Sequence, residues 1–181
     1  VDSDLAELKK YDLFSKYSSF GQYSLPLFVF ALIPFMAFSG SLFSGITVGE
    51  MGFVLLTPNI EIVSGWVNMS NKQLKIFSSP SKRPTTYIVP ASVAAPKWLA
   101  VKNTLAIRLS NDPFIKNICG LLGLPIVSTS ANLHGENPCK SAEEVQKIMG
   151  SQLDYIVFKQ TGPFNNPSTI VDLSSGKIIR P

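Results

Sequence analysis

From Met51 to the end of the chain, short apolar runs alternate with turn residues, and this alternation constrains the fold most strongly. Such runs are typical of buried strands and short helices. The 181 residues include 13 prolines and 12 glycines without a period, which excludes coiled coils, collagen-like chains and simple helical bundles. With 45% hydrophobic and 15% charged residues, global disorder is also excluded. We therefore predict one mixed α/β domain spanning residues 1–181.

Local signals place helices and strands along this domain. An Asp-Pro pair at 112–113 and a glycine at 123 frame one helix, and a Ser-x-x-Glu spacing at 141–144 opens another. The expected helices are Ile60–Val67, Phe114–Leu122 and Ala142–Met149. The expected strands are Phe53–Leu56, Thr86–Val89, Thr104–Leu109, Pro125–Val127, Tyr155–Phe158, Thr169–Asp172 and Ile178–Ile179.

The N-terminal part differs in composition from the rest of the chain. Residues 17–49 contain no charged side chain, and Leu25–Phe43 is apolar and long enough to be a membrane span. Pro26 and Pro34 weaken a simple helix there. Two interpretations of Leu25–Phe43 stay open, namely a membrane segment and a buried strand–turn–strand that begins the sheet.

The net charge of +4 is unevenly distributed, because residues 1–50 carry −2 and the remainder +6. A basic C-terminal part suits an anionic partner such as a nucleotide or RNA, although dispersed charges are also typical of an ordinary solvated surface. Cys119, Cys139 and His134 are the only cysteines and histidine. They provide neither a disulfide framework nor a Cys/His zinc site, and we expect a reducing, cytoplasmic setting.

The densest polar motif runs from Ser128 to Asn132, directly after a short apolar run. Strand alternation puts Ser128 and Ser130 on one side. Hydroxyls, amides and backbone N–H groups at the end of a strand can hold phosphate or carboxylate oxygens, and a self-satisfied Ser/Thr turn is the structural alternative. Ser168 also places a hydroxyl beside an expected strand, and the hydroxyl of Thr86 is a further candidate for binding such oxygens.

Arg108 and Arg180 lie in or just after apolar runs, where a surface arginine is less expected. A buried arginine needs an anionic partner because it cannot lose its charge. For Arg108 the structural alternative is an ion pair with Asp112 or Asp172, and Arg180 could be a solvated tail residue. No nucleophile–base pair is visible, so we interpret His134 as a loop residue. There is also no Gly-rich phosphate loop.

Six motifs follow one another between Met51 and Pro181. They are KRPTTYIVPAS at 82–92, PKWL at 96–99, TLAIR at 104–108, PIVSTSAN at 125–132, PSTI at 167–170 and a hydrophobic pair with arginine at 178–180. In this order and spacing they resemble the TsaC/YrdC threonylcarbamoyl-AMP synthase family. The resemblance implies a twisted, open mixed α/β sheet with flanking helices around a basic concave cavity.

The resemblance also implies an activity. In that family ATP with Mg²⁺, L-threonine and bicarbonate yield threonylcarbamoyl-AMP and pyrophosphate, for the N6-threonylcarbamoyladenosine (t6A37) modification of tRNA. This chemistry needs positioning and charge neutralisation more than a protein nucleophile. Further implied partners are tRNA or tRNA-modifying proteins in the cytoplasm, with no stable membrane partner. The implied substrate- and nucleotide-binding residues are Thr86, Arg108, Ser128, Ser130, Asn132, Ser168 and Arg180.

The chain departs from the family pattern at two places. The Pro-Thr-Glu segment and the Lys-x-Arg pair of the family are missing before Met51, and the Trp-Pro-Gly-Pro before Thr86 is here Ser81-Lys-Arg-Pro84. Residues 1–50 are thus atypical, and an offset reading frame that rejoins near Val48 would explain both the missing motifs and the uncharged run. The alternative function is a non-catalytic nucleotide- or RNA-binding protein of this family.

Overall fold

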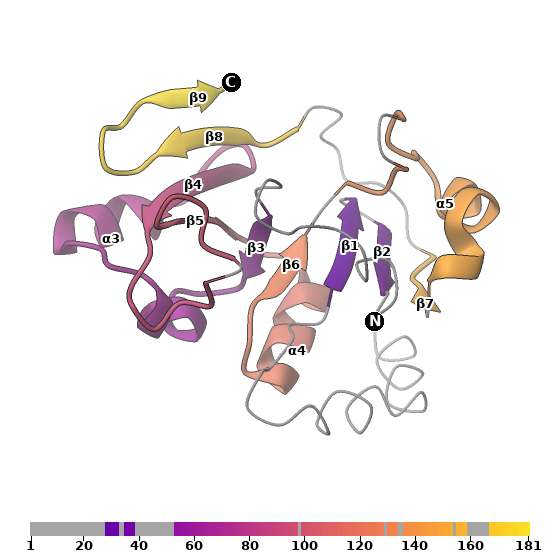
Figure 1. The fold of residues 1–181 in the computed structure, drawn as a ribbon, viewed down its shortest axis with the longest axis horizontal. Coiled ribbons are helices and arrows are strands. Elements are labelled where there is room, and N and C mark those ends of the chain that lie inside the picture. Colours follow the sequence, from indigo (N-terminus) through magenta and orange to yellow (C-terminus); the bar gives the residue numbers. More distant parts are fainter. Residues whose placement is uncertain are drawn as a thin grey trace.

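The computed structural model describes residues 28–32, 35–38, 53–97, 99–128, 130–133, 136–153, 155–158 and 167–181. Within these residues one sheet has the strand order β7-β2-β1-β6-β3-β5-β4-β8-β9 (Figure 1). Parallel pairs (β1 with β6, β3 with β5, β4 with β8) occur beside antiparallel ones, which confirms the predicted open mixed sheet. The strands are β1 (Phe28–Leu32), β2 (Phe35–Phe38), β3 (Val54–Thr57), β4 (Thr85–Pro90), β5 (Thr104–Leu109), β6 (Ile126–Ser128), β7 (Tyr155–Ile156), β8 (Thr169–Asp172) and β9 (Ile178–Arg180).

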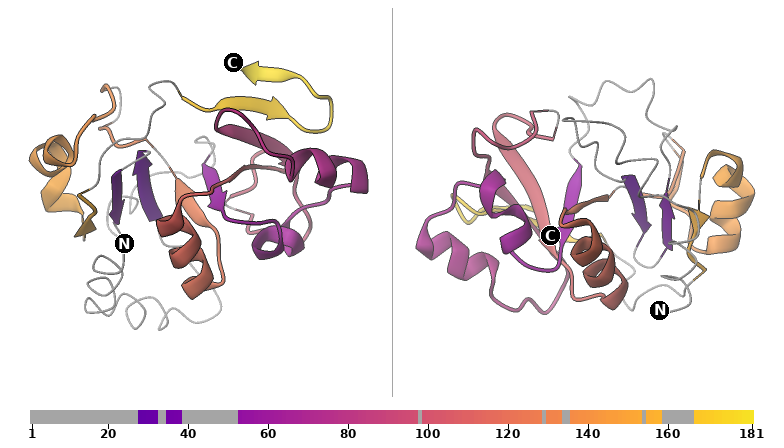
Figure 2. Two further views of the ribbon diagram at one scale, coloured as in Figure 1. Left: turned by 180° about the vertical axis from the view of Figure 1, so that it is seen from behind. Right: turned by 90° about the horizontal axis from the view of Figure 1, so that it is seen from below.

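Helices flank this sheet, as predicted. Figures 1 and 2 place α3 and α5 toward opposite ends of the sheet, with α4 between them. The expected helix at 60–67 is a short 3-10 helix. The helices are η1 (Glu61–Trp66), α3 (Asn71–Phe77), α4 (Pro113–Leu122), α5 (Ala142–Met149) and η2 (Gly150–Gln152).

The caps of α4 confirm the local prediction. Asp112 Oδ1 accepts hydrogen bonds from the amides of Phe114 and Ile115 at 2.8 and 3.2 Å. Gly123 ends the helix with a φ of 65°, a conformation that glycine adopts without the steric penalty of a side chain. The capping residues Asp112 and Gly123 therefore define the two ends of α4.

The predicted helix over Ala142–Met149 is confirmed as α5 with the same bounds, and a further helix, α3, begins with a capping box. Ser141 caps α5 by accepting from Glu144 N at 3.1 Å, but the Glu144 carboxylate accepts from the amide of Lys140 at 2.6 Å instead of that of Ser141. A reciprocal capping box occurs at α3, where Gln73 Oε1 accepts from the amide of Ser70 at 2.9 Å and Ser70 Oγ accepts from the amide of Gln73 at 3.3 Å. The Ser-x-x-Gln spacing at 70–73 therefore marks the start of α3 in the sequence.

The predicted strands from residue 53 onward are present with their ends shifted by one residue or less, except that the strand expected over Tyr155–Phe158 ends at Ile156. Inside Leu25–Phe43 the described residues form β1 and β2, which pair antiparallel with Ala31 opposite Met36. This matches the strand–turn–strand interpretation. Among the residues described, no helix is both long and apolar enough to cross a bilayer.

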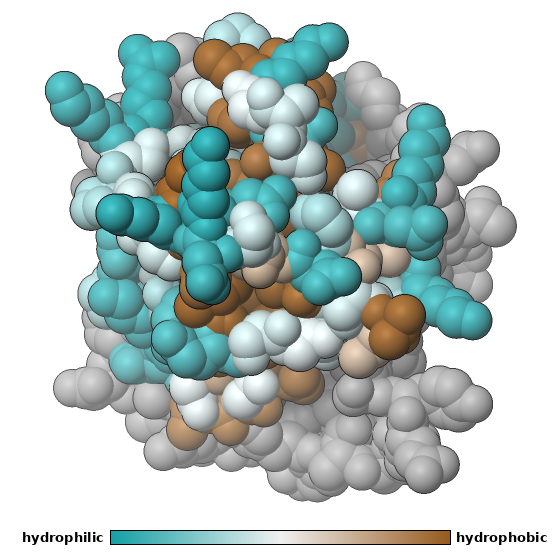
Figure 3. All heavy atoms as spheres, turned by 90° about the vertical axis from the view of Figure 1, so that its left-hand side faces the viewer, coloured by the Kyte–Doolittle hydropathy of each residue, from teal (hydrophilic) through white to brown (hydrophobic). Residues whose placement is uncertain are grey.

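Alternation along the strands gives the sheet two apolar faces. One face packs residues such as Leu55 and Ile107 against Phe77 of α3 and Val63 of η1. The opposite face packs Leu56, with Ile126 of β6, against the buried side of α4. Figure 3 views the molecule from the left-hand side of Figure 1, and there long hydrophilic side chains project over recessed hydrophobic patches.

A two-residue turn before β5 generates a stability prediction. Val101 and Thr104 exchange backbone hydrogen bonds of 3.0 and 2.9 Å around Lys102 and Asn103, whose φ values are 49° and 60°. Lysine is poorly suited to this left-handed region, whereas asparagine tolerates it. Lys102→Asn should raise the free energy of unfolding by about 0.5–1 kcal/mol in urea titrations. Lys97→Asn is the control, and an equal gain there would contradict the explanation.

Candidate functional site

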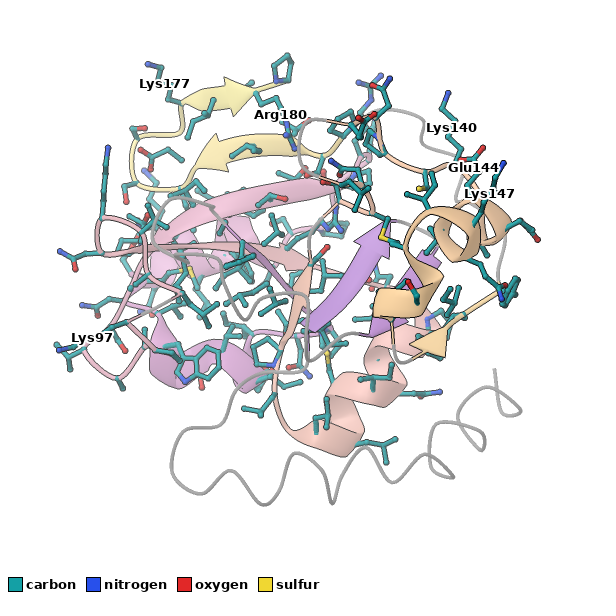
Figure 4. The ribbon with its side chains drawn as sticks, turned by 45° about the vertical axis from the view of Figure 1, so that its right-hand side comes forward. Lys97, Lys140, Glu144, Lys147, Lys177 and Arg180 are labelled. Carbon is teal, nitrogen blue, oxygen red and sulfur yellow. The ribbon has the colours of Figure 1, made fainter. Side chains whose placement is uncertain are left out.

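Thr86, Ser168 and Arg180 form a hydrogen-bonded group at one end of the sheet. Thr86 Oγ1 and Ser168 Oγ lie 2.9 Å apart in a buried contact. Arg180 Nε and Nη2 donate to the carbonyl oxygen of Ser168 at 3.1 and 2.9 Å, and Figure 4 shows the Arg180 side chain directed from β9 toward β8. The pairing of β4 with β8 and of β8 with β9 thus joins three residues predicted from separate motifs.

Arg108 on β5 shares a face of the sheet with Thr86. Ile107 lies opposite Tyr87, so their neighbours Arg108 and Thr86 both point to the other face. The side chain of Arg108 is only 9% exposed. Burial, followed by repulsion from Arg180, lowers the pKa of Arg108 to about 10. Arg108 therefore keeps its positive charge at neutral pH in a partly dehydrated place.

The ion pair considered for Arg108 is not formed by either candidate acid. Asp112 caps α4. Asp172 Oδ1 accepts from the amides of Ser174 and Ser175 at 2.8 and 3.4 Å. Hydrogen bonds from these two residues lower the pKa of Asp172, and the bond from the Ser174 amide has the largest effect. A carboxylate beside Arg108 would raise its pKa, whereas within the described part of the chain the two causes that act on this pKa, burial and Arg180, both lower it. Among the described residues, the two arginines thus lack a carboxylate and favour an added anion.

Ser128 and Ser130 lie farther along the sheet. Ser128 ends β6 opposite Val54, two residues before the Leu56 position that pairs with Arg108, so Ser128 faces the same side. Two strands, β3 and β5, separate β6 from β4, which corresponds to roughly 14 Å across the sheet. Ser128 is buried and Ser130 is exposed. A ligand touching both groups of residues has to extend across several strands.

Asn132 closes the loop that follows β6. Its Nδ2 donates to the carbonyl oxygens of Leu133 and Glu136 at 2.9 and 3.0 Å. The side-chain oxygen of Asn132 is buried and has no hydrogen-bond partner. The structural alternative, a loop that binds its own backbone, therefore accounts for one end of the Asn132 amide and leaves an acceptor at the other. His134 and Gly135 lie outside the described residues.

The cysteines show no sign of reactivity. Cys119 and Cys139 are buried and free, and burial raises the pKa of Cys119 to about 12, which disfavours the reactive thiolate. Cys119 Sγ donates to the carbonyl oxygen of Leu56 at 3.7 Å. In the described part of the chain, no group of three or more His, Cys, Asp or Glu side chains could hold a metal ion. The buried polar side chains of the described residues are those of threonine, serine and arginine.

The fold and this face define an open mixed α/β protein with two arginines and several hydroxyls on one face of its sheet. The chain belongs to the Sua5/YciO/YrdC family, whose model, described as telomere recombination, matches residues 49–181. This confirms the family resemblance and its extent.

Curated relatives agree with this assignment. Proteins named threonylcarbamoyl-AMP synthase from Photorhabdus laumondii and from Haemophilus influenzae (strain KW20) are each 37% identical over 135 residues, which cover 72% of this chain and 71% and 73% of theirs.

Solved structures support the fold. P. abyssi Sua5 complexed with L-threonine superposes with a TM-score of 0.66 at 16% identity, over 82% of this chain and 47% of that one. This chain thus spans about half of Sua5. E. coli YciO superposes with a TM-score of 0.63 at 19% identity, over 86% of this chain and 82% of that one. At such identities the likeness concerns the arrangement of strands and helices.

The Thr86–Ser168 contact generates a prediction on stability. Thr86→Val keeps the shape and removes the buried hydroxyl, and Ser168→Ala removes its partner. Each single change should destabilise the fold by about 1–2 kcal/mol, and the double change by less than the sum, with a coupling of about 1 kcal/mol. Urea unfolding of the four proteins measures this cycle, and additive effects would mean that the two hydroxyls do not interact.

For Arg108 we predict that removing the charge increases the stability of the ligand-free protein and weakens the binding of an anion. Arg108→Met removes a dehydrated charge repelled by Arg180 while keeping similar bulk, so the melting temperature without ligand should rise. Inorganic pyrophosphate should raise the melting temperature of the unaltered protein and have less effect on this variant. Lys97→Met is the control at an exposed position. A loss of stability in Arg108→Met without ligand would contradict the unpaired charge.

Proposed function

We propose that this protein is an L-threonylcarbamoyladenylate synthase, a nucleotidyltransferase that makes threonylcarbamoyl-AMP and pyrophosphate from L-threonine, bicarbonate and ATP. The observation that carries the proposal is the buried Arg108 charge beside Arg180, with no described carboxylate to neutralise it. The relatives named threonylcarbamoyl-AMP synthase support the reaction class. A triphosphate and a carboxylate are the anions that this reaction brings to the site.

The proposed reaction needs no protein nucleophile. The amine of threonine adds to the carbon of bicarbonate and water leaves, which forms a carbamate. A carbamate oxygen then attacks the α-phosphorus of ATP, and the bond from phosphorus to the bridging oxygen breaks to release pyrophosphate. Charge develops on phosphate oxygens and on the leaving group, so fixed cations and hydrogen-bond donors lower the barrier. Mg²⁺ enters with ATP in this scheme and shares in neutralising the phosphates.

The protein contributes positioning and charge. We assign Arg108 and Arg180 to phosphate or carboxylate oxygens, because they are the cations on this face. Thr86 and Ser168 keep Arg180 oriented and offer hydroxyls beside it. Ser128, Ser130 and Asn132 complete the proposed set of contacts to nucleotide, threonine or carbamate from the other side of β3 and β5.

The proposed product serves the t6A modification of tRNA, so tRNA or tRNA-modifying proteins are the proposed partners and the cytoplasm the proposed compartment. The basic concave cavity expected from the sequence stays a prediction.

A second function is a nucleotide- or RNA-binding protein without synthesis. The specific observation in its favour is the missing Lys-x-Arg pair before Met51, which removes two cations from the family pattern. Such a protein would bind tRNA with an affinity that falls steeply with salt, and would not release pyrophosphate in response to threonine.

Pyrophosphate release by the purified chain with ATP and Mg²⁺ tests the proposal. Release should require both L-threonine and bicarbonate. Arg108→Ala should lower kcat/KM about 10–100-fold and Ser130→Ala about 3–10-fold, because each loses a contact to a charged group. Lys177→Ala, directly before β9 and away from Arg180 (Figure 4), is the matched control and should stay near the unaltered rate. Release without threonine, or none from the folded protein, would contradict synthesis.

A further inference from the structure

Two basic residues that the assigned site does not use, Lys82 and Arg83, are held in an ordered turn. Ser81 Oγ and Thr85 Oγ1 lie 2.9 Å apart, and Thr85 Oγ1 also donates to the carbonyl oxygen of Arg83 at 3.1 Å. These bonds close residues 81–85 on themselves directly before β4. Because the backbone of this turn is fixed, the two side chains start from defined positions.

The turn is attached to the strand that carries Ser168. The amide of Thr169 donates to the carbonyl oxygen of Pro84 at 3.1 Å, and Thr85 lies opposite Thr169 in the β4–β8 pairing. Lys82 and Arg83 therefore begin within a few residues of the Thr86–Ser168 contact. Long flexible side chains from these positions can reach a ligand bound there.

Strand direction brings the other cations to the same end of the sheet. β5 runs antiparallel to β4, so its last residues, including Arg108, lie beside the first residues of β4. β9 runs antiparallel to β8, so Arg180 lies beside the first half of β8. Three separate parts of the chain thus supply four basic residues to one end: Lys82 and Arg83, Arg108, and Arg180.

These four residues differ in burial. Arg108 is buried, whereas Lys82, Arg83 and Arg180 are exposed. The described acids close in sequence to these strands are engaged elsewhere, Asp112 at the cap of α4 and Asp172 at the turn that follows β8. Positive charge thus extends from the inside of the sheet outward. A short anion needs only the inner part, while an elongated polyanion can use all of it.

We propose that Lys82 and Arg83 form an outer binding site for the β- and γ-phosphates of ATP, beyond the two inner arginines. This inference rests on the proposed function, since it assumes that the nucleotide binds on this face. Mg·ATP and the doubly charged carbamate of threonine together carry more negative charge than Arg108 and Arg180 neutralise. Lys82 and Arg83 supply the missing charge from within this chain, at a turn where the family pattern has a Trp-Pro-Gly sequence.

Nucleotides of different length test the proposal on the full chain. Calorimetric Kd values are measured for Mg·ATP and for AMP at two salt concentrations. The Kd for Mg·ATP should rise about 3–10-fold for Lys82→Ala and for Arg83→Ala, while that for AMP stays within twofold. The salt dependence of Mg·ATP binding should become shallower, because fewer counterions are released.

Matched variants separate charge from structure. Arg83→Lys keeps a charge and should retain most of the Mg·ATP affinity, and thermal unfolding checks that each variant folds. Lys97→Ala and Lys177→Ala remove exposed cations that lie away from Arg180 in Figure 4 and should leave both affinities unchanged.

The outcomes separate this inference from the proposed function. Unchanged Mg·ATP affinity in Lys82→Ala and Arg83→Ala, or equal losses for Mg·ATP and AMP, overturns the outer phosphate site alone. Loss of tRNA affinity with normal Mg·ATP affinity overturns it as well, in favour of an RNA contact. Failure of the unaltered chain to bind any nucleotide overturns the proposed function together with this inference.

Discussion

The unneutralised charge of Arg108 is the constraint around which one end of this molecule is organised. A guanidinium cannot release its proton near neutral pH, and removing it from water is unfavourable unless an opposite charge replaces the lost hydration. The pKa of Arg108 falls to about 10 through burial and through Arg180, which is still far above physiological pH. Among the described residues no carboxylate replaces that hydration, so an anion bound beside Arg108 would stabilise the folded protein.

The sheet topology decides which residues share this constraint. The run β5-β4-β8-β9 brings together strands from the middle and the end of the chain, and only through it does Thr86 meet Ser168, 82 residues away. On the far side of β6, β1 and β2 extend the same sheet. The described part of the atypical N-terminal region is therefore built into the fold, even though it lacks the motifs of the family.

Apolar packing leaves room for this polar end. α4 covers the face at Leu56 and Ile126, while the same face at β5, β4 and β8 presents Arg108, Thr86 and Ser168. Hydrogen bonds replace hydrophobic contacts there, with Ser168 joining Thr86 and Arg180. A polar patch of this kind gives up some of the stability that apolar packing would provide. Lys82 and Arg83 continue the positive charge into solvent, where it carries little desolvation penalty.

Local sequence determined the ends of α4, the start of α5 and the positions of most strands, because caps and short apolar runs act within a few residues. It also determined the family, through the order of motifs. The α3 capping box, formed by Ser70 and Gln73, also acts within a few residues and is visible in the sequence as a Ser-x-x-Gln spacing. Only the tertiary structure decided that Arg180 binds Ser168 and that neither Asp112 nor Asp172 is the partner of Arg108. Strand register couples residues far apart in the chain, and no local periodicity specifies which strands become neighbours.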